Sequence, residues 1–332
     1  MWFEELVGFH EENPDQVRSN LDLKGEYILS RVNGKKIKCG SLSIPSLKEL
    51  QESNADLKSY NTQIEVSEII SDANAIHLDQ ANNQSVVQAA SQFNLLEMVS
   101  PDVTPEEGVD LYEDDFTQGP ACAIACGAGT IYRNYFVNVN GQIGQTASNQ
   151  INCLSELKEE FDHEIQNYFQ VVNGYAFVDQ DDLLRIGNRI AHSSEDQYER
   201  LKGKLKIGVQ WNTEVTLTTK GHEVTQVYCS ALPIGYASIP PSIWEPFARL
   251  ILSATYEATF HVALMNYERT GNHKLFLTLV GGGVFGNKIE WIVDAIKNSL
   301  NKFKNTPISV LIVSFRNSNP SIKKMIAEFS FT

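Results

Sequence analysis

The stretch from Leu277 to Ile296 constrains the fold of this 332-residue chain more than any other. An apolar, β-prone run ends at Val280, three glycines follow, and an apolar helical spacing begins at Ile289. This order predicts a strand, a glycine loop and a helix. Glycines let a backbone approach a ligand closely, and the free N–H groups that begin a helix favour an anion. The stretch therefore predicts a phosphate or diphosphate site, with a tight packing turn as the structural alternative.

The glycines do not have the spacing of the common nucleotide-binding fingerprints. They do not form G-x-G-x-x-G, and they lack the Lys-Ser or Lys-Thr pair of a P-loop. The loop instead resembles the G-x-G-V-F-G loop of macrodomains, the α/β modules that bind ADP-ribose, in which this loop wraps the diphosphate. The resemblance implies a diphosphate loop made of Gly281, Gly282, Gly283, Val284, Phe285, Gly286 and Asn287.

Two earlier segments resemble other ligand positions of that family. In macrodomains one strand ends in Gly-Asp-Ile, whose aspartate binds the adenine amino group, and another ends in Asn-Ala-Ala-Asn beside the distal ribose. Here Asp72 follows one β-prone run, and Gln92, Phe93 and Asn94 follow the next. The resemblance implies an adenine contact for Asp72 and ribose contacts for the other three residues. An ordinary Asx turn is the alternative for Asp72.

The C-terminal third repeats the second half of a macrodomain in its order of elements. Strand, long helix, strand, glycine loop, helix and strand follow one another, and the last apolar run is typical of a strand covered on both faces. The family places an aromatic or polar residue at the end of that strand, against the adenine. Phe315 and Asn317 occupy this place, and core packing is the alternative for Phe315.

An acidic stretch precedes Gln118 and a run of small apolar residues that predicts a close-packed helix. Asp115 lies one turn before this helix, where a carboxylate comes close to the protein interior. The stretch replaces the glycine-rich loop that macrodomains place beside the ribose. In this it resembles a divergent subgroup, including bacterial effectors, that uses aspartates to remove ADP-ribose from a protein side chain.

That reaction breaks a glycosidic bond through a transition state resembling an oxocarbenium ion, and it needs carboxylates to activate water or assist the leaving group. Asp115 is the first candidate for this role. Asp114 and Asp110 lie on the same stretch, and Glu214, on a later strand, is a more distant candidate. If two of these aspartates lie close together, their repulsion raises one pKa and makes that group an acid.

We therefore expect a hydrolase that binds ADP-ribose and releases it from a modified protein, with arginine-linked substrates favoured by the acidic site. A reader module that binds ADP-ribose without turnover is the alternative from another class. The expected partner is an ADP-ribosylated protein. No cofactor and no metal site are expected, although the aspartates would accommodate a divalent ion.

Composition sets limits on location and partners. A net charge of -14 argues against nucleic acid, because neutralising phosphates needs clustered Lys and Arg. Five cysteines, odd in number and scattered through apolar segments, suit free thiols in a reducing compartment. No signal peptide and no membrane-spanning run is visible. We expect a cytoplasmic protein with no membrane partner, delivered to a host cell if it is an effector.

The sequence thus predicts an α/β fold, a macrodomain-like three-layer α/β/α arrangement with a mixed central sheet. Residues 1–60 are expected to form an N-terminal extension with a hairpin at Asn33-Gly34 and a helix capped by Ser46. Residues 61–332 are expected to form the macrodomain-like domain, interrupted by a mostly helical insertion at about 137–206.

Overall fold

The computed structural model describes residues 1–54, 60, 62–162 and 168–329. A seven-stranded sheet forms its centre, with strands in the order β4 (Ser41–Ser43), β11 (Gly208–Glu214), β12 (Glu223–Cys229), β6 (Val86–Ala90), β13 (Lys274–Leu277), β14 (Ser309–Ser314) and β5 (Glu65–Ile70). The last five run parallel to one another, whereas β11 is antiparallel to both of its neighbours. The mixed central sheet predicted from the sequence is confirmed.

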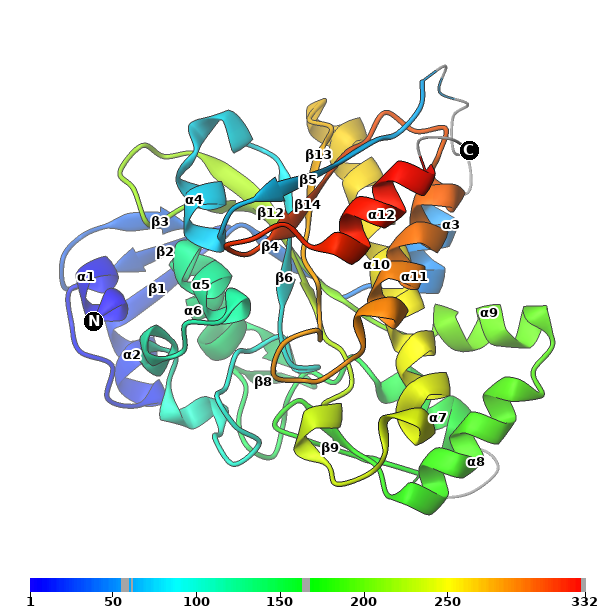
Figure 1. The fold of residues 1–332 in the computed structure, drawn as a ribbon. Helices are drawn as coiled ribbons and strands as arrows, with labels where there is room; N and C mark the ends of the chain where they lie inside the picture. The colour runs from blue at the N-terminus through cyan, green and yellow to red at the C-terminus, as the bar shows by residue number, and fades with distance from the viewer. Residues whose placement is uncertain (55–59, 61, 163–167, 330–332) are drawn as a thin grey trace.

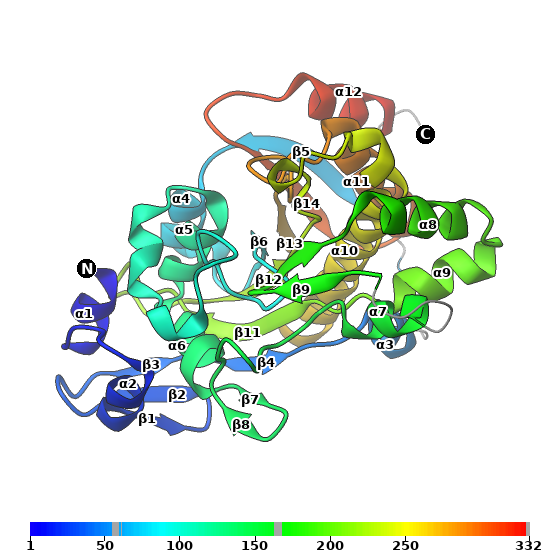
Figure 2. The same cartoon turned by 90° about the horizontal axis from the view of Figure 1, so that it is seen from below.

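Helices cover both faces of this sheet, so the predicted three layers are present (Figures 1 and 2). One face carries α3 (Leu47–Ser53), α10 (Pro241–Thr270), α11 (Ile289–Lys302) and α12 (Pro320–Phe329). The other face carries α4 (Ala73–Leu78), α5 (Gln118–Ala125) and α6 (Gly127–Ile131). Strands β12, β6 and β13 are therefore covered on both faces and are almost entirely buried, whereas the edge strand β5 has no fully buried residue.

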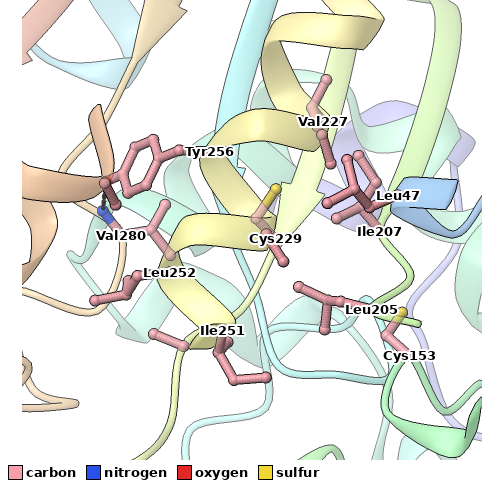
Figure 3. Close-up of a cluster of buried hydrophobic side chains, with 14 of the residues drawn as sticks. Leu47, Cys153, Leu205, Ile207, Val227, Cys229, Ile251, Leu252, Tyr256 and Val280 are labelled. Carbon is pink, nitrogen blue, oxygen red and sulfur yellow. Dashed lines mark hydrogen bonds between the residues drawn. The ribbon is translucent and has the colours of Figure 1, made fainter. Parts of the chain in front are cut away.

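Helix α10 forms the centre of the larger hydrophobic core. It packs against β12, β6 and β13 on one side and against α11 and α3 on the other, so it is apolar nearly all round. Figure 3 shows Tyr256 and Leu252 of this helix on the side of Val280, with Ile251 lower in the same cluster of buried side chains. A helix buried on several sides gives a weak amphipathic pattern, and its length identifies it better than its period does.

The first 60 residues are less separate than predicted. Helices α1 (Trp2–Val7) and α2 (Pro14–Asn20) pack beside a small antiparallel sheet of β1 (Leu21–Lys24), β2 (Tyr27–Ser30) and β3 (Lys36–Lys38). The predicted hairpin is confirmed as β2 and β3, and Ser46 caps α3 in a capping box with Glu49. Strand β4, however, pairs with β11 as an edge strand of the central sheet, where Trp211 Nε1 donates to Ser43 Oγ at 2.9 Å.

The insertion contains both helices and hairpins, so it is less helical than predicted. Its helices are α7 (Ser155–Asp162), α8 (Gln180–Ala191) and α9 (Glu195–Gly203), and its hairpins are β7 (Asn138–Val139) with β8 (Gln142–Ile143) and β9 (Gln170–Val172) with β10 (Tyr175–Phe177). Helix α8 packs its buried Leu183, Ile186 and Ile190 side against the core and α10. The insertion is therefore an integral part of the domain.

Candidate functional site

The carboxyl ends of the five parallel strands meet at one edge of the sheet, the position where α/β proteins bind ligands. The segments that follow β5, β6, β12, β13 and β14 all begin there. We call this the carboxyl edge. Most of the residues predicted to bind ligand belong to these segments, so the topology brings distant parts of the sequence to one place.

The glycine loop leaves β13 at this edge and is held in a fixed conformation. Tyr256 of α10 anchors its base, because the hydroxyl donates to Thr278 O at 2.7 Å and accepts from Val280 N at 3.0 Å (Figure 3). Gly281 has a φ of 80°, and a Cβ there would collide with Ala231. Asn287 then closes the loop, with its N–H donating to Gly281 O at 2.9 Å.

The outer side of the loop is open. Within the described part of the chain, the N–H groups of Gly283, Val284 and Phe285 have no hydrogen-bond partner. A Cβ on Gly283 would meet no atom within 4 Å, and Val284 is 64% exposed. Successive unpaired N–H groups that precede a helix can bind an anion. A packing turn alone does not require this open row of donors.

The ends of β5 and β14 bring the predicted adenine contacts together. Ser71 N donates to Ser314 O at 3.2 Å, which places Asp72 and Phe315 beside each other at the edge. Phe315 is 64% exposed, so it is not a core residue. Asn317, also exposed, donates its N–H to Phe315 O at 2.7 Å. One oxygen of Asp72 accepts from Ala75 N at 2.8 Å and caps α4, as the Asx alternative predicted.

The predicted ribose contacts lie deeper than expected. Gln92, Phe93 and Asn94 are buried, and they hold the turn of the β9–β10 hairpin. Phe93 N donates to Gly174 O at 2.9 Å, and Asn94 Nδ2 donates to Gln150 Oε1 at 2.9 Å. The insertion covers this segment, so the side chains of Gln92, Phe93 and Asn94 are buried beneath it and do not face an open edge of the sheet.

Three aromatic rings join the insertion to the glycine loop. Tyr175 of β10, Tyr236 after β12 and Phe285 contact one another with ring centroids 5.3 to 5.8 Å apart. The Tyr175 hydroxyl donates to Met98 O at 2.8 Å, and Gly235 N donates to Phe285 O at 3.0 Å. The trio therefore fixes the glycine loop against the segment that follows β6.

The four predicted catalytic carboxylates lie in different parts of the structure. Asp115 is half-buried near the carboxyl edge, and its Oδ1 accepts from Thr117 N at 2.9 Å, whereas Asp114 is exposed. Asp110 points to the N-terminal helix, where Oδ1 accepts from Phe3 N at 3.3 Å. Glu214 ends β11, which runs antiparallel, so it lies at the opposite edge of the sheet. Asp110 and Glu214 are therefore outside the site.

A carboxyl group that the sequence did not single out lies inside it. Glu97 follows β6 and is 4% exposed, and burial raises its pKa well above the ordinary value. The nearby Asp115 carboxylate raises the pKa further, while Arg133 lowers it. Glu97 Oε1 has no hydrogen-bond partner among the described residues. A lone acidic residue in the apolar run from 95 to 99 is the one sequence signal for it.

The surroundings of Glu97 are built from α5 and the segment after it. A side chain at Gly119 would collide with Glu97 Oε2, so this glycine makes room for the carboxyl group. Gln118 fixes the end of β6 by accepting from Ala90 N at 2.8 Å and donating to Gln88 O at 3.0 Å. Arg133 is fully buried, donates to Leu95 O at 3.1 Å, and has no ion pair within the described residues.

Other kinds of centre find no support in the described residues. All five cysteines are free and buried, and burial raises the pKa of each thiol, to about 12 for Cys39 and Cys229, so none is an activated nucleophile. No group of three or more His, Cys, Asp or Glu side chains in the described ranges is placed to hold a metal ion. None of the helices described is both long and apolar enough to cross a membrane.

No family model and no curated protein matches the chain. Among solved structures, it is similar to poly(ADP-ribose) glycohydrolase from Deinococcus radiodurans in complex with ADP-ribose, with a TM-score of 0.48 and 12% identity over 87% of this chain and 95% of that one. It is also similar to poly(ADP-ribose) glycohydrolase from Thermomonospora curvata, with a TM-score of 0.44 and 11% identity over 96% of this chain and 95% of that one. Identities this low transfer no residue roles.

Proposed function

We propose that the protein binds ADP-ribose along the carboxyl edge and hydrolyses the glycosidic bond that joins it to a protein side chain. The diphosphate would lie on the open N–H groups of Gly283, Val284 and Phe285, which present donors and no negative charge. Adenine would pack on the exposed ring of Phe315 beside Asp72. The ligand would then extend from β14 past the glycine loop, with its distal ribose toward Glu97.

The observation that carries the hydrolase is the pair formed by Glu97 and Asp115. One carboxyl is buried with a raised pKa, and its neighbour is half-buried and adds to that rise. A carboxyl group whose pKa is raised by burial is suited to act as an acid, and a neighbouring carboxylate can stabilise positive charge. Glu97 would be the acid because it retains its proton, and Asp115 the carboxylate.

In this mechanism Glu97 donates its proton to the leaving atom as the bond to the anomeric carbon breaks. The negative charge of Asp115 offsets the positive charge that grows on the ribose ring. Water adds to the anomeric carbon and returns a proton to Glu97, so the carboxyl group ends as it began. An arginine-linked substrate is the preferred one, because a guanidine leaving group must be protonated as it departs and carries a positive charge in an acidic site.

The reader module remains the second candidate because of one observation, the burial of Glu97. A carboxyl group that is only 4% exposed and packed against Gly119 presents little surface to a substrate. If nothing larger than water reaches it, ADP-ribose binds at the edge without being cleaved. The two candidates therefore share the binding site and differ only in turnover.

Release of ADP-ribose from an arginine-modified protein separates them. We expect turnover by the unmodified protein and a loss of about a thousandfold for Glu97→Gln, in the range of a lost general acid. Asp114→Asn is the matched control, since it removes an exposed carboxylate one residue from Asp115, and turnover should stay within about twofold. Binding of ADP-ribose without any turnover by the unmodified protein would reject the hydrolase in favour of the reader.

A further inference from the structure

A cavity of about 330 Å³ lies beside the carboxyl edge, between the insertion and the segment that follows β12. The β9–β10 hairpin and the start of α8 form one wall, and Pro233, Tyr236 and Ala237 form the other. Tyr236 also contacts Phe285 of the glycine loop, so the cavity is a direct neighbour of the proposed ADP-ribose site.

The cavity has aromatic walls. Phe169, Phe177, Tyr236 and Trp244 line it, and Phe177 is 40% exposed although large and apolar. Trp244 is buried, and its Nε1, which has no hydrogen-bond partner among the described residues, has almost no surface exposed to the cavity. The rings therefore offer a ligand their apolar faces.

Two carboxylates line the same cavity. Asp179 caps α8 by accepting from Asp182 N at 2.8 Å, and Asp182 pairs with the exposed Arg185 at 3.2 Å. Among the residues that the structure describes, no lysine or arginine lines the cavity. Aromatic faces together with carboxylates attract a cation, and they repel a phosphate or another carboxylate.

We infer that this cavity binds a basic side chain, arginine or lysine, of the protein from which ADP-ribose is removed. The aliphatic stem would lie against the rings, with the charged group toward Asp179 and Asp182. That the bound side chain belongs to the ADP-ribosylated protein rests on the proposed function. That the cavity binds a basic side chain at all depends only on the cavity. A net charge of -14 would also draw basic segments to this surface.

Fluorescence anisotropy with a labelled Ala-Arg-Ala amide peptide tests this inference, with the citrulline peptide as its neutral isostere. We expect the arginine peptide to bind about tenfold more tightly, as a partly buried cation with aromatic and carboxylate contacts does. Asp182→Asn and Phe177→Ala should each remove most of this preference. Asp181→Asn, an exposed carboxylate on the same helix that does not line the cavity, should keep it.

ADP-ribose affinity, measured on the same variants, separates this inference from the proposed function. Cavity variants that lose the arginine preference and keep the ADP-ribose affinity support both the cavity as a basic-side-chain site and the separate ADP-ribose site. Equal affinity of the unmodified protein for the arginine and citrulline peptides overturns the inference, whether or not ADP-ribose binds. An arginine preference without any ADP-ribose binding rejects the proposed function and leaves the cavity as a site for basic peptides.

Discussion

The glycine loop and the acidic stretch are two neighbouring parts of the proposed site, and they differ in how far the sequence reveals them. The features by which the loop is proposed to bind the ligand lie in consecutive residues, because turn geometry and free N–H groups are properties of a local backbone. In the acidic stretch, Asp110 contacts the N-terminal helix, Asp114 is exposed to solvent, and Asp115 lies toward the proposed site. A carboxylate takes its chemistry from burial and neighbours, which depend on residues distant in the sequence.

Asp115 tests whether any of the acidic stretch acts in the site. Asp115→Asn should lower turnover about a hundredfold through loss of transition-state charge stabilisation. Removing its negative charge also lowers the pKa of Glu97, so the decline of activity at high pH should move to lower pH. Turnover measured against pH checks both expectations. An unchanged profile would show that Asp115 does not act on Glu97.

Gly281 tests the local character of the loop. Gly281→Ala should lower the free energy of unfolding by about 2 kcal/mol, because φ is positive and the new methyl group meets Ala231. Gly283→Ala, which meets no atom within 4 Å, should change it by less than about 0.5 kcal/mol. Urea titration of both variants measures the difference. Equal stabilities would mean that the loop is not held as described.

Phe315 tests the adenine end of the edge. Phe315→Ala should weaken ADP-ribose binding about tenfold through loss of aromatic stacking, with little change in stability since the ring is exposed. Leu184→Ala removes an exposed apolar side chain from α8 and serves as the control. Calorimetry that finds the same affinity for both variants would place adenine elsewhere.

Because Glu97 is buried, the free energy of unfolding should depend on pH and should fall as pH rises. Above pH 4.5 the unfolded carboxyl group loses its proton while the folded one keeps it, so the unfolded state binds fewer protons. Stability of the unmodified protein should therefore fall as pH rises toward the raised pKa, by up to about 1.4 kcal/mol per pH unit. Glu97→Gln lacks this term, so its stability relative to the unmodified protein should rise with pH. If melting curves recorded across this pH range gave a constant difference in stability between the two proteins, the burial of Glu97 would be contradicted.

Much of the architecture followed from the sequence because strands, caps and turns are local. The Asn33-Gly34 hairpin, the Ser46 capping box and the strand before the glycine loop all form where the residues predicted them. The pairing of β4 with β11 was not predicted, since a three-residue edge strand has no periodic signal of its own.

The sequence indicates only some of the candidate site residues, for the same reason. The open glycine loop and the exposed position of Phe315 depend on single strand ends, which a linear pattern can locate, and their roles in binding stay predictions. The direction of β11, which carries Glu214 to the far edge, depends on sheet topology. The burial of Glu97 depends on Gly119 and on the insertion, neither of which a linear pattern connects to it.

Calorimetry of ADP-ribose binding, with the unmodified protein compared to Gly283→Glu, tests the central claim most directly. The substitution places bulk and a negative charge on the open N–H groups, at a position where its Cβ meets no atom within 4 Å. We predict micromolar-range binding by the unmodified protein, as is ordinary for a small ligand of this size, and a loss of at least about a hundredfold in the variant. Absence of binding by the unmodified protein, or equal binding by both, would contradict the account of the carboxyl edge as an ADP-ribose site.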